Sequence, residues 1–173
     1  MASAAHLGNA VSVLAHRALG FEESSLAVHL RKRLSVAAGD TAGRTSATRP
    51  LTLLVADGTF AVCRLEPGAP HPGWATAYPF FSITRTADEL SVVCPEAAVP
   101  ERVKCERGWR CLRVAGAIPF SAVGVLASLT TPLAQAGVGV FAVSTFDTDY
   151  LLVKAADLGR AVDVLRRQRH TIR

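Results

Sequence analysis

Long apolar runs are missing from this 173-residue sequence, although half of its residues are apolar. No run reaches the roughly 18 residues that a membrane-spanning helix needs. The sequence also lacks a recognisable signal peptide, which would combine a charged start, an apolar centre and a small-residue cleavage site. We therefore expect a globular, cytoplasmic protein without a membrane partner, large enough for one ordinary domain or two small ones.

Cysteine is scarce, and the four cysteines form no metal or redox motif. Cys63, Cys94, Cys105 and Cys111 include no C-x-x-C pair, and no histidine lies near them at zinc-ligand spacing. Three of them lie in apolar, strand-like runs, where a free cysteine behaves as a small hydrophobic residue. The pattern predicts reduced thiols and no metal site.

Signals of catalysis are also missing. The sequence has no evident nucleophile–base pair, no metal-ligand cluster and no glycine loop that would cradle a phosphate. We therefore expect a protein that is not an enzyme and has no cofactor. An uncharacterised enzyme of amino-acid metabolism stays as the weaker alternative, because Asp147 and Asp149 alone do not define an active site.

The net charge of +5 is unevenly distributed. Residues 1–49 hold six basic and three acidic residues, and four arginines follow Leu165, so the stretch between them is slightly acidic. A nucleic-acid-binding protein usually carries a basic stripe on its folded face. The distribution argues against a nucleic-acid partner.

Residues 1–49 differ from the rest in being rich in alanine, serine and arginine, and they end in an aperiodic segment typical of a linker. Three explanations remain open: an organelle transit peptide, a disordered extension, or a start codon assigned too far upstream. The arginine and serine bias favours a transit peptide, whereas Glu22 and Glu23 oppose it. We place this segment outside the fold.

The first half of the remaining chain shows strand patterns. Two apolar runs, 51–55 and 59–65, are separated by Ala-Asp-Gly and predict a strand, a tight turn and a strand. Prolines throughout 66–79 exclude a regular helix there. The runs 80–84 and 90–94 flank a polar loop and predict a hairpin.

The second half predicts a strand over 109–114, a helix, two further strands and a last helix that starts near Asp157. The first helix is expected from Ser121, as its N-cap, to about Ala136, with Pro132 loosening its last turn. The strand 138–145 is apolar on both faces. One face can pack on helices, so the other needs a second cover from the first half or from a partner subunit.

Four segments carry a resemblance to a known family: Trp109-Arg-Cys-Leu-Arg-Val-Ala-Gly116, Pro119-Phe-Ser-Ala-Val-Gly-Val-Leu126, Val140-Phe-Ala-Val-Ser-Thr-Phe-Asp-Thr-Asp-Tyr-Leu-Leu-Val153 and the hairpin Phe80 to Glu96. The first three resemble the ACT domain of the CASTOR-like proteins, and the hairpin resembles the preceding ACT-like module of small family members. A looser similarity links the end of the strand 140–145 to aspartokinase regulatory domains.

The resemblance implies an α+β fold made of two tandem ferredoxin-like ACT modules of βαββαβ type, with joined antiparallel sheets. The first module would span 50–107 with a reduced helix, because its proline-rich loop lies where a helix is expected. The second would span 108–173 and end in the basic tail. The animal arginine sensors of the family have four modules, so a homodimer of this chain would restore that number.

The resemblance also implies a ligand between modules, held by the first strand–helix loop and by a neighbouring strand end. Physical chemistry indicates the same place, since a helix start offers unpaired backbone donors to a carboxylate and Asp147 or Asp149 can accept an ammonium group. Gly124 further suggests a close approach to the backbone. The predicted ligand-binding residues are Ile118, Pro119, Phe120, Ser121, Gly124, Thr145, Phe146, Asp147 and Asp149.

The sequence therefore predicts a non-catalytic regulatory or sensor protein that binds an amino acid at an interface between ACT modules. Arginine itself is not transferred from the family, because the loop 118–124 offers no additional carboxylate for a guanidinium group. The alternative is a dimerisation module, or one that binds a regulated partner protein, without any ligand. In that case the doubly apolar strand 138–145 would form the interface.

Overall fold

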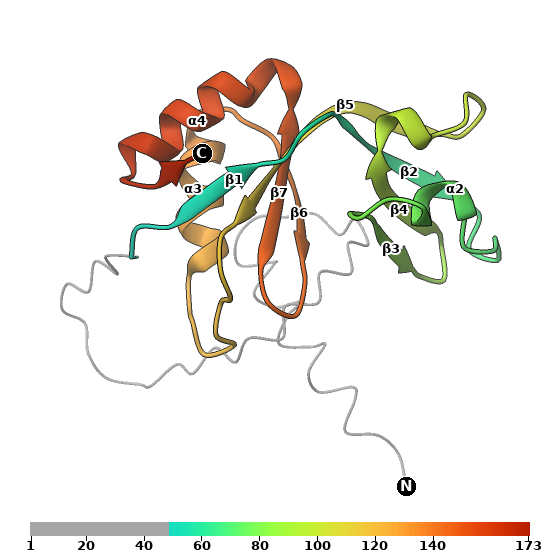
Figure 1. The fold of residues 1–173 in the computed structure, drawn as a ribbon, viewed down its shortest axis with the longest axis horizontal. Coiled ribbons are helices and arrows are strands. Elements are labelled where there is room, and N and C mark those ends of the chain that lie inside the picture. Colours follow the sequence, from blue (N-terminus) through green and yellow to red (C-terminus); the bar gives the residue numbers. More distant parts are fainter. Residues whose placement is uncertain (1–48) are drawn as a thin grey trace, which may run out of the picture. The chain divides into compact units, whose positions relative to one another are not determined.

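The computed structural model describes residues 49–173 of the protein (Figure 1). The predicted N-terminal extension lies outside the described residues, apart from Arg49. Strands, helices and two short 3-10 turns follow in the order β1 Thr52–Val55, β2 Phe60–Leu65, α2 Gly73–Thr76, β3 Ser82–Arg85, β4 Leu90–Pro95, η1 Glu96–Ala98, β5 Cys105–Val114, α3 Val125–Gln135, β6 Val140–Ser144, β7 Asp149–Lys154, η2 Ala155–Asp157, α4 Leu158–Arg167 and β8 Thr171–Ile172.

The ten-residue strand β5 joins the whole sheet. Its first half pairs with β2, which continues through β4 to the edge strand β3. Its second half pairs with β1 on one side and with β7 on the other, and β6 lies beyond β7. We call residues 60–104, which contain β2 to η1, the smaller half, and β1 together with the elements from β5 onwards the larger half. The joined antiparallel sheet confirms the α+β fold of ferredoxin-like ACT modules.

The runs 51–55 and 59–65 form strands β1 and β2, as predicted, but the two strands do not pair with each other. β1 and β2 lie end to end along β5, with Leu53 opposite Val114 and Cys63 opposite Cys105. The bend at Asp57-Gly58 offsets two successive strands and does not reverse the chain. Gly58 has a φ of 77°, which a glycine adopts without steric cost. β1 also pairs in parallel with β8, so it lies between β5 and β8.

The smaller half contains the predicted hairpin of β3 and β4, which is confirmed. The proline-rich segment contains only the four-residue helix α2, which agrees with a reduced helix in this part of the fold. The core of the smaller half packs under α2 and consists of Ala61, Cys63, Ala75, Leu90, Val92, Cys94 and Val99.

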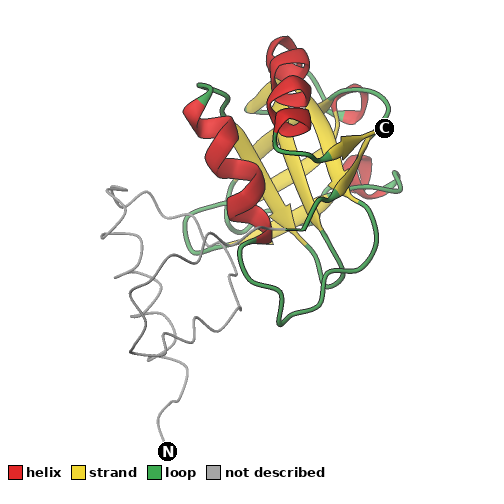
Figure 2. Ribbon diagram, turned by 90° about the vertical axis from the view of Figure 1, so that its left-hand side faces the viewer, coloured by secondary structure: helices red, strands yellow, loops and turns green. Residues whose placement is uncertain are grey.

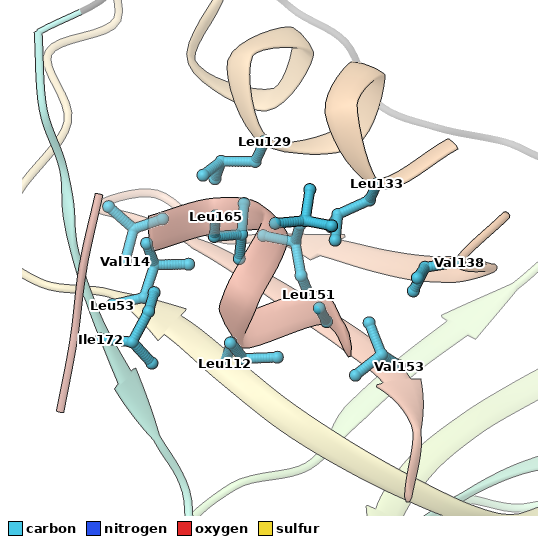
Figure 3. Close-up of a cluster of buried hydrophobic side chains, with 12 residues drawn as sticks. Leu53, Leu112, Val114, Leu129, Leu133, Val138, Leu151, Val153, Leu165 and Ile172 are labelled. Atoms are coloured by element: carbon cyan, nitrogen blue, oxygen red, sulfur yellow. The ribbon is translucent and has the colours of Figure 1, made fainter. Parts of the chain in front are cut away.

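The larger half runs β5–α3–β6–β7–α4–β8, the βαββαβ order expected of an ACT module. Helices α3 and α4 cover one face of its strands (Figure 2). Figure 3 shows the core between them, where leucines of the helices meet those of the sheet. Its fully buried members include Leu53, Leu129, Leu133, Leu151 and Leu165. Among the described residues no helix is both long and apolar enough to cross a membrane.

The opposite face of the larger half receives the second cover that strand 138–145 requires. Phe141 and Val143 of β6 pack into a cluster with Phe60 and Val93 of the smaller half. The cover therefore comes from within the chain, which is one of the two expected sources. Phe80, in the segment before β3, packs against the same cluster.

Candidate functional site

The two loops that the sequence singles out lie side by side at one end of the larger half. The backbone N–H of Ile118 donates a hydrogen bond to the Asp147 carbonyl at 2.7 Å. The rings of Phe120 and Phe146 meet edge to face, with centroids 4.9 Å apart. Loop 115–124 and the β6–β7 turn thus contact each other within a single chain, and Figure 1 shows both at the same end of the strands.

The β6–β7 turn is a tight hairpin with Phe146 and Asp147 at its tip. The Thr145 N–H donates to the Thr148 carbonyl at 2.9 Å, and the Thr145 hydroxyl accepts from the Thr148 N–H. The buried hydroxyl of Thr148 donates to the Val114 carbonyl at the end of β5, at 2.7 Å. Sequence reasoning missed Thr148, although threonines on both sides of a two-residue tip are a signal for such a turn.

Asp149 is the buried member of the predicted site. It lies opposite Ser144 in the β6–β7 ladder, and the Ser144 hydroxyl donates to its carboxylate at 2.6 Å. Only 6% of Asp149 is exposed, and no cationic residue of the described chain forms an ion pair with it. Because Leu151, two residues on, is buried against the helices, the Asp149 side chain lies on the same face as α3.

Helix α3 begins later than predicted. Its first residue is Val125 and its N-cap is Gly124, so Ser121 lies outside the helix and does not cap it. Gly124 has a φ of 80°, a left-handed conformation that residues with a side chain rarely adopt, and the backbone alone explains the glycine, since an added Cβ would meet no atom within 4 Å. No side chain caps α3, so its first backbone N–H groups have no partner supplied by a capping residue.

Apart from Asp149 and the half-buried Ile118, the predicted site residues are exposed. Phe146 is 78% exposed, and Phe120 and Val123 are also largely open to solvent. Two hollows on the described surface are lined by other residues. Within the described residues, the predicted site is therefore an open apolar surface around a buried acid.

The four cysteines are free thiols, as predicted. The hydrogen bond between the thiols of Cys63 and Cys94, together with burial, raises the pKa of Cys63. Burial raises the pKa of Cys111 to about 11. Both changes disfavour the reactive thiolate. Residues 49–173 contain no group of three or more His, Cys, Asp or Glu side chains placed to hold a metal ion.

Two family models match consecutive parts of the chain. The model of the ACT domain matches residues 104–167, which contain β5 to α4 and all the predicted site residues. A second model, of an N-terminal domain, matches residues 58–102, which contain β2 to η1.

Among curated proteins, the cytosolic arginine sensor for mTORC1 subunit 1 of Mus musculus is 26% identical over 106 residues, or 56% of this chain. The chain spans only 32% of that sensor's length. The human sensor of the same name is 34% identical over 61 residues, which are 35% of this chain and 18% of the sensor.

Among solved structures, protein Atu0741 from Agobacterium tumefaciens is 38% identical, with a TM-score of 0.69 over 72% of this chain and 92% of that one. A structure of aspartokinase alpha and beta subunits is 17% identical and has a TM-score of 0.50 over 68% of this chain and 96% of the other, which bears on the fold alone. The chain therefore contains an ACT domain at residues 104–167 and is similar, over part of its length, to the cytosolic arginine sensors.

Proposed function

We propose that the protein is a non-catalytic, cytoplasmic sensor that binds a free amino acid where loop 118–124 meets the strand ends 144–149. The observation that carries this proposal is the carboxylate of Asp149. It is buried, it has no cationic partner among the described residues, and it lies in the same loop pair as the uncapped start of α3.

The two charges of an amino acid match these two groups. The N-terminal end of a helix favours a carboxylate, because its unpaired N–H groups and dipole present positive charge. A buried carboxylate that lacks a counter-ion favours an ammonium group. Phe120 and Phe146 would flank the ligand, and a second ACT module from another copy of the chain would close the open surface into a homodimer.

The relatives support an amino-acid ligand, since their name describes an arginine sensor. Arginine is not the ligand that we propose here. The loop 118–124 contains no acidic residue, so a guanidinium group would find no carboxylate beyond those that hold the ammonium group.

The test is a thermal-shift screen of the full chain against the standard amino acids. A ligand at about 100 times its Kd stabilises the native state by about 2.7 kcal/mol, so one amino acid should raise the melting temperature by several degrees. Asp149→Asn keeps an acceptor for Ser144 but removes the charge, and it should abolish this shift. Asp163→Asn, at an exposed position of α4, is the matched control and should keep it.

A ligand-free interaction module is the second candidate function, because Phe120, Val123 and Phe146 expose a patch of apolar surface. Light scattering, which reports the oligomeric state, together with the amino-acid screen separates the sensor from the interaction module. A flat amino-acid screen together with a dimer that Phe146→Ser dissociates would favour the interaction module and contradict the sensor.

A further inference from the structure

A row of side chains crosses three strands on the sheet face opposite α3 and α4. Arg113 of β5 lies opposite Leu54 of β1 on one side and opposite Tyr150 of β7 on the other. Residues directly opposite each other in a ladder share a face. Their sequence neighbours Leu53 and Leu151 are buried against the helices, so this row lies on the other face.

A hollow of about 290 Å³ lies over this row. Its floor consists of Leu54, Ala56 and the buried Cys111, and Phe80 of the smaller half lines it with Pro79. Cys111 contributes an apolar surface here and no nucleophile, because burial raises its pKa to about 11. None of the predicted ligand-binding residues lines this hollow.

Aromatic contacts hold the wall of the hollow in place. The ring of Phe80 lies 4.6 Å from that of Tyr150, tilted by 30°. On its other side Phe80 meets the buried ring of Phe60 edge to face at 5.6 Å. A wall that is packed on both sides does not have to be ordered when a ligand binds, which lowers the entropic cost of binding.

Arg113 supplies the charge. It is the one charged residue that lines the hollow, and it is exposed. Within residues 49–173 its side chain forms no hydrogen bond or ion pair, whereas neighbouring Arg110 donates to the Ala56 carbonyl. The hollow thus combines an apolar floor, an aromatic wall and a guanidinium group that can bind a carboxylate with two parallel hydrogen bonds.

We propose that this hollow binds a small carboxylate with an aromatic or branched aliphatic group, which lies against Phe80 and Tyr150 while the carboxylate contacts Arg113. A volume of about 290 Å³ suits a ligand of roughly ten non-hydrogen atoms, from the volume of about 30 Å³ that one water molecule occupies in the liquid. Because Phe80 belongs to the smaller half and Tyr150 to the larger, the ligand would bridge the two halves.

The experiment titrates the full chain with phenylacetate and with the uncharged 2-phenylacetamide, and follows backbone amides by NMR. Phenylacetate should shift the amides of Leu54, Cys111 and Arg113, and the amide analogue should bind at least about tenfold more weakly because it cannot pair with the guanidinium group. Arg113→Gln should weaken phenylacetate binding by about tenfold or more. Arg102→Gln, at an exposed arginine outside the hollow, should leave it unchanged.

Two further variants make the result specific. Ala56→Leu fills the floor and should block phenylacetate, with the urea unfolding midpoint as the check on folding. Asp149→Asn should leave phenylacetate binding intact. Loss of phenylacetate binding would therefore contradict a ligand in this hollow without contradicting the proposed amino-acid site. Absence of these amide shifts at millimolar phenylacetate would overturn the proposal, as would equal binding by Arg113→Gln. A dimer that Ala56→Leu dissociates, with no response to phenylacetate, would assign this face to a second copy and also overturn it.

Discussion

At the scale of single residues, His170 links three parts of the larger half. It is buried, and its Nδ1 accepts a hydrogen bond from the Leu51 N–H at 3.2 Å. The backbone of Ser128 in α3 also favours the protonated imidazole and raises its pKa. Residue 132 is a proline, so the Ser128 carbonyl lacks the N–H donor that a helix would normally supply. The imidazole is therefore influenced by a backbone group that the proline leaves without its helical partner.

The protonation of His170 should make stability depend on pH. Burial lowers the pKa of His170 below its ordinary value of 6.5, although the Ser128 backbone opposes this. The unfolded chain then binds a proton before the folded chain does, so the free energy of unfolding should decrease as the pH falls from 6.5 towards the folded-state pKa. Urea unfolding midpoints between about pH 8 and about pH 5 measure this effect.

His170→Asn keeps an acceptor near the position of Nδ1 and should flatten the pH dependence in that range. His71→Asn, at an exposed histidine in the proline-rich segment, should retain it. An unchanged slope in His170→Asn would show that other groups cause the dependence.

At the scale of elements, the start of α3 depends on one backbone conformation. Gly124 adopts a left-handed conformation directly before Val125, and this lets loop 115–124 enter the helix. An L-residue with a side chain pays about 1–2 kcal/mol for that conformation. The helix start is therefore specified by a glycine, and the sequence pattern of apolar residues says little about it.

Gly124→Ala should lower the free energy of unfolding by about 1–2 kcal/mol. The loss would come from the backbone alone, because the added methyl group meets no atom within 4 Å. Gly139→Ala is the matched control, since its added methyl group also meets open space and its φ lies outside the left-handed region. Urea unfolding of both variants measures the difference, and equal stability of the two would contradict this role of Gly124.

At the scale of the whole described chain, β1 and β5 make the two halves dependent on each other. β1 comes before the smaller half in sequence, yet it completes the sheet of the larger half. β5 pairs with β2 through its first residues and with β1 and β7 through its last. Because one strand is shared by both halves of the sheet, we expect residues 49–173 to unfold in a single cooperative transition.

Leu53→Ala should destabilise both halves together, by about 2–5 kcal/mol, since Leu53 is fully buried in the core of the larger half. Trp74 packs in the smaller half and Trp109 lies in β5, so their indole signals in NMR report on the two regions. Both signals should disappear at the same, lowered urea concentration. Leu54→Ala, at the next position and on the opposite face, should lower the free energy of unfolding by less than Leu53→Ala does. A Trp74 signal that persists to higher urea concentration than the Trp109 signal would contradict a single cooperative transition.

The sequence by itself determined the elements with strong local periodicity and the family. The β3–β4 hairpin, the helix that starts near Asp157 and the strands 109–114 and 138–145 all follow from which residues are apolar. It also indicated that loop 118–124 and the turn near Asp147 belong together, through the resemblance to ACT domains. The ligand contacts of these residues stay a prediction.

The tertiary structure alone decided which strands pair and which polar groups are buried. An apolar pattern determines the face that a residue presents, but a strand can pair with any partner of matching pattern, and long-range contacts make that choice. Leu53 therefore lies opposite Val114 instead of pairing with β2. Asp149 is buried for the same reason, because the β6–β7 ladder places it beside Ser144 on the face that α3 covers.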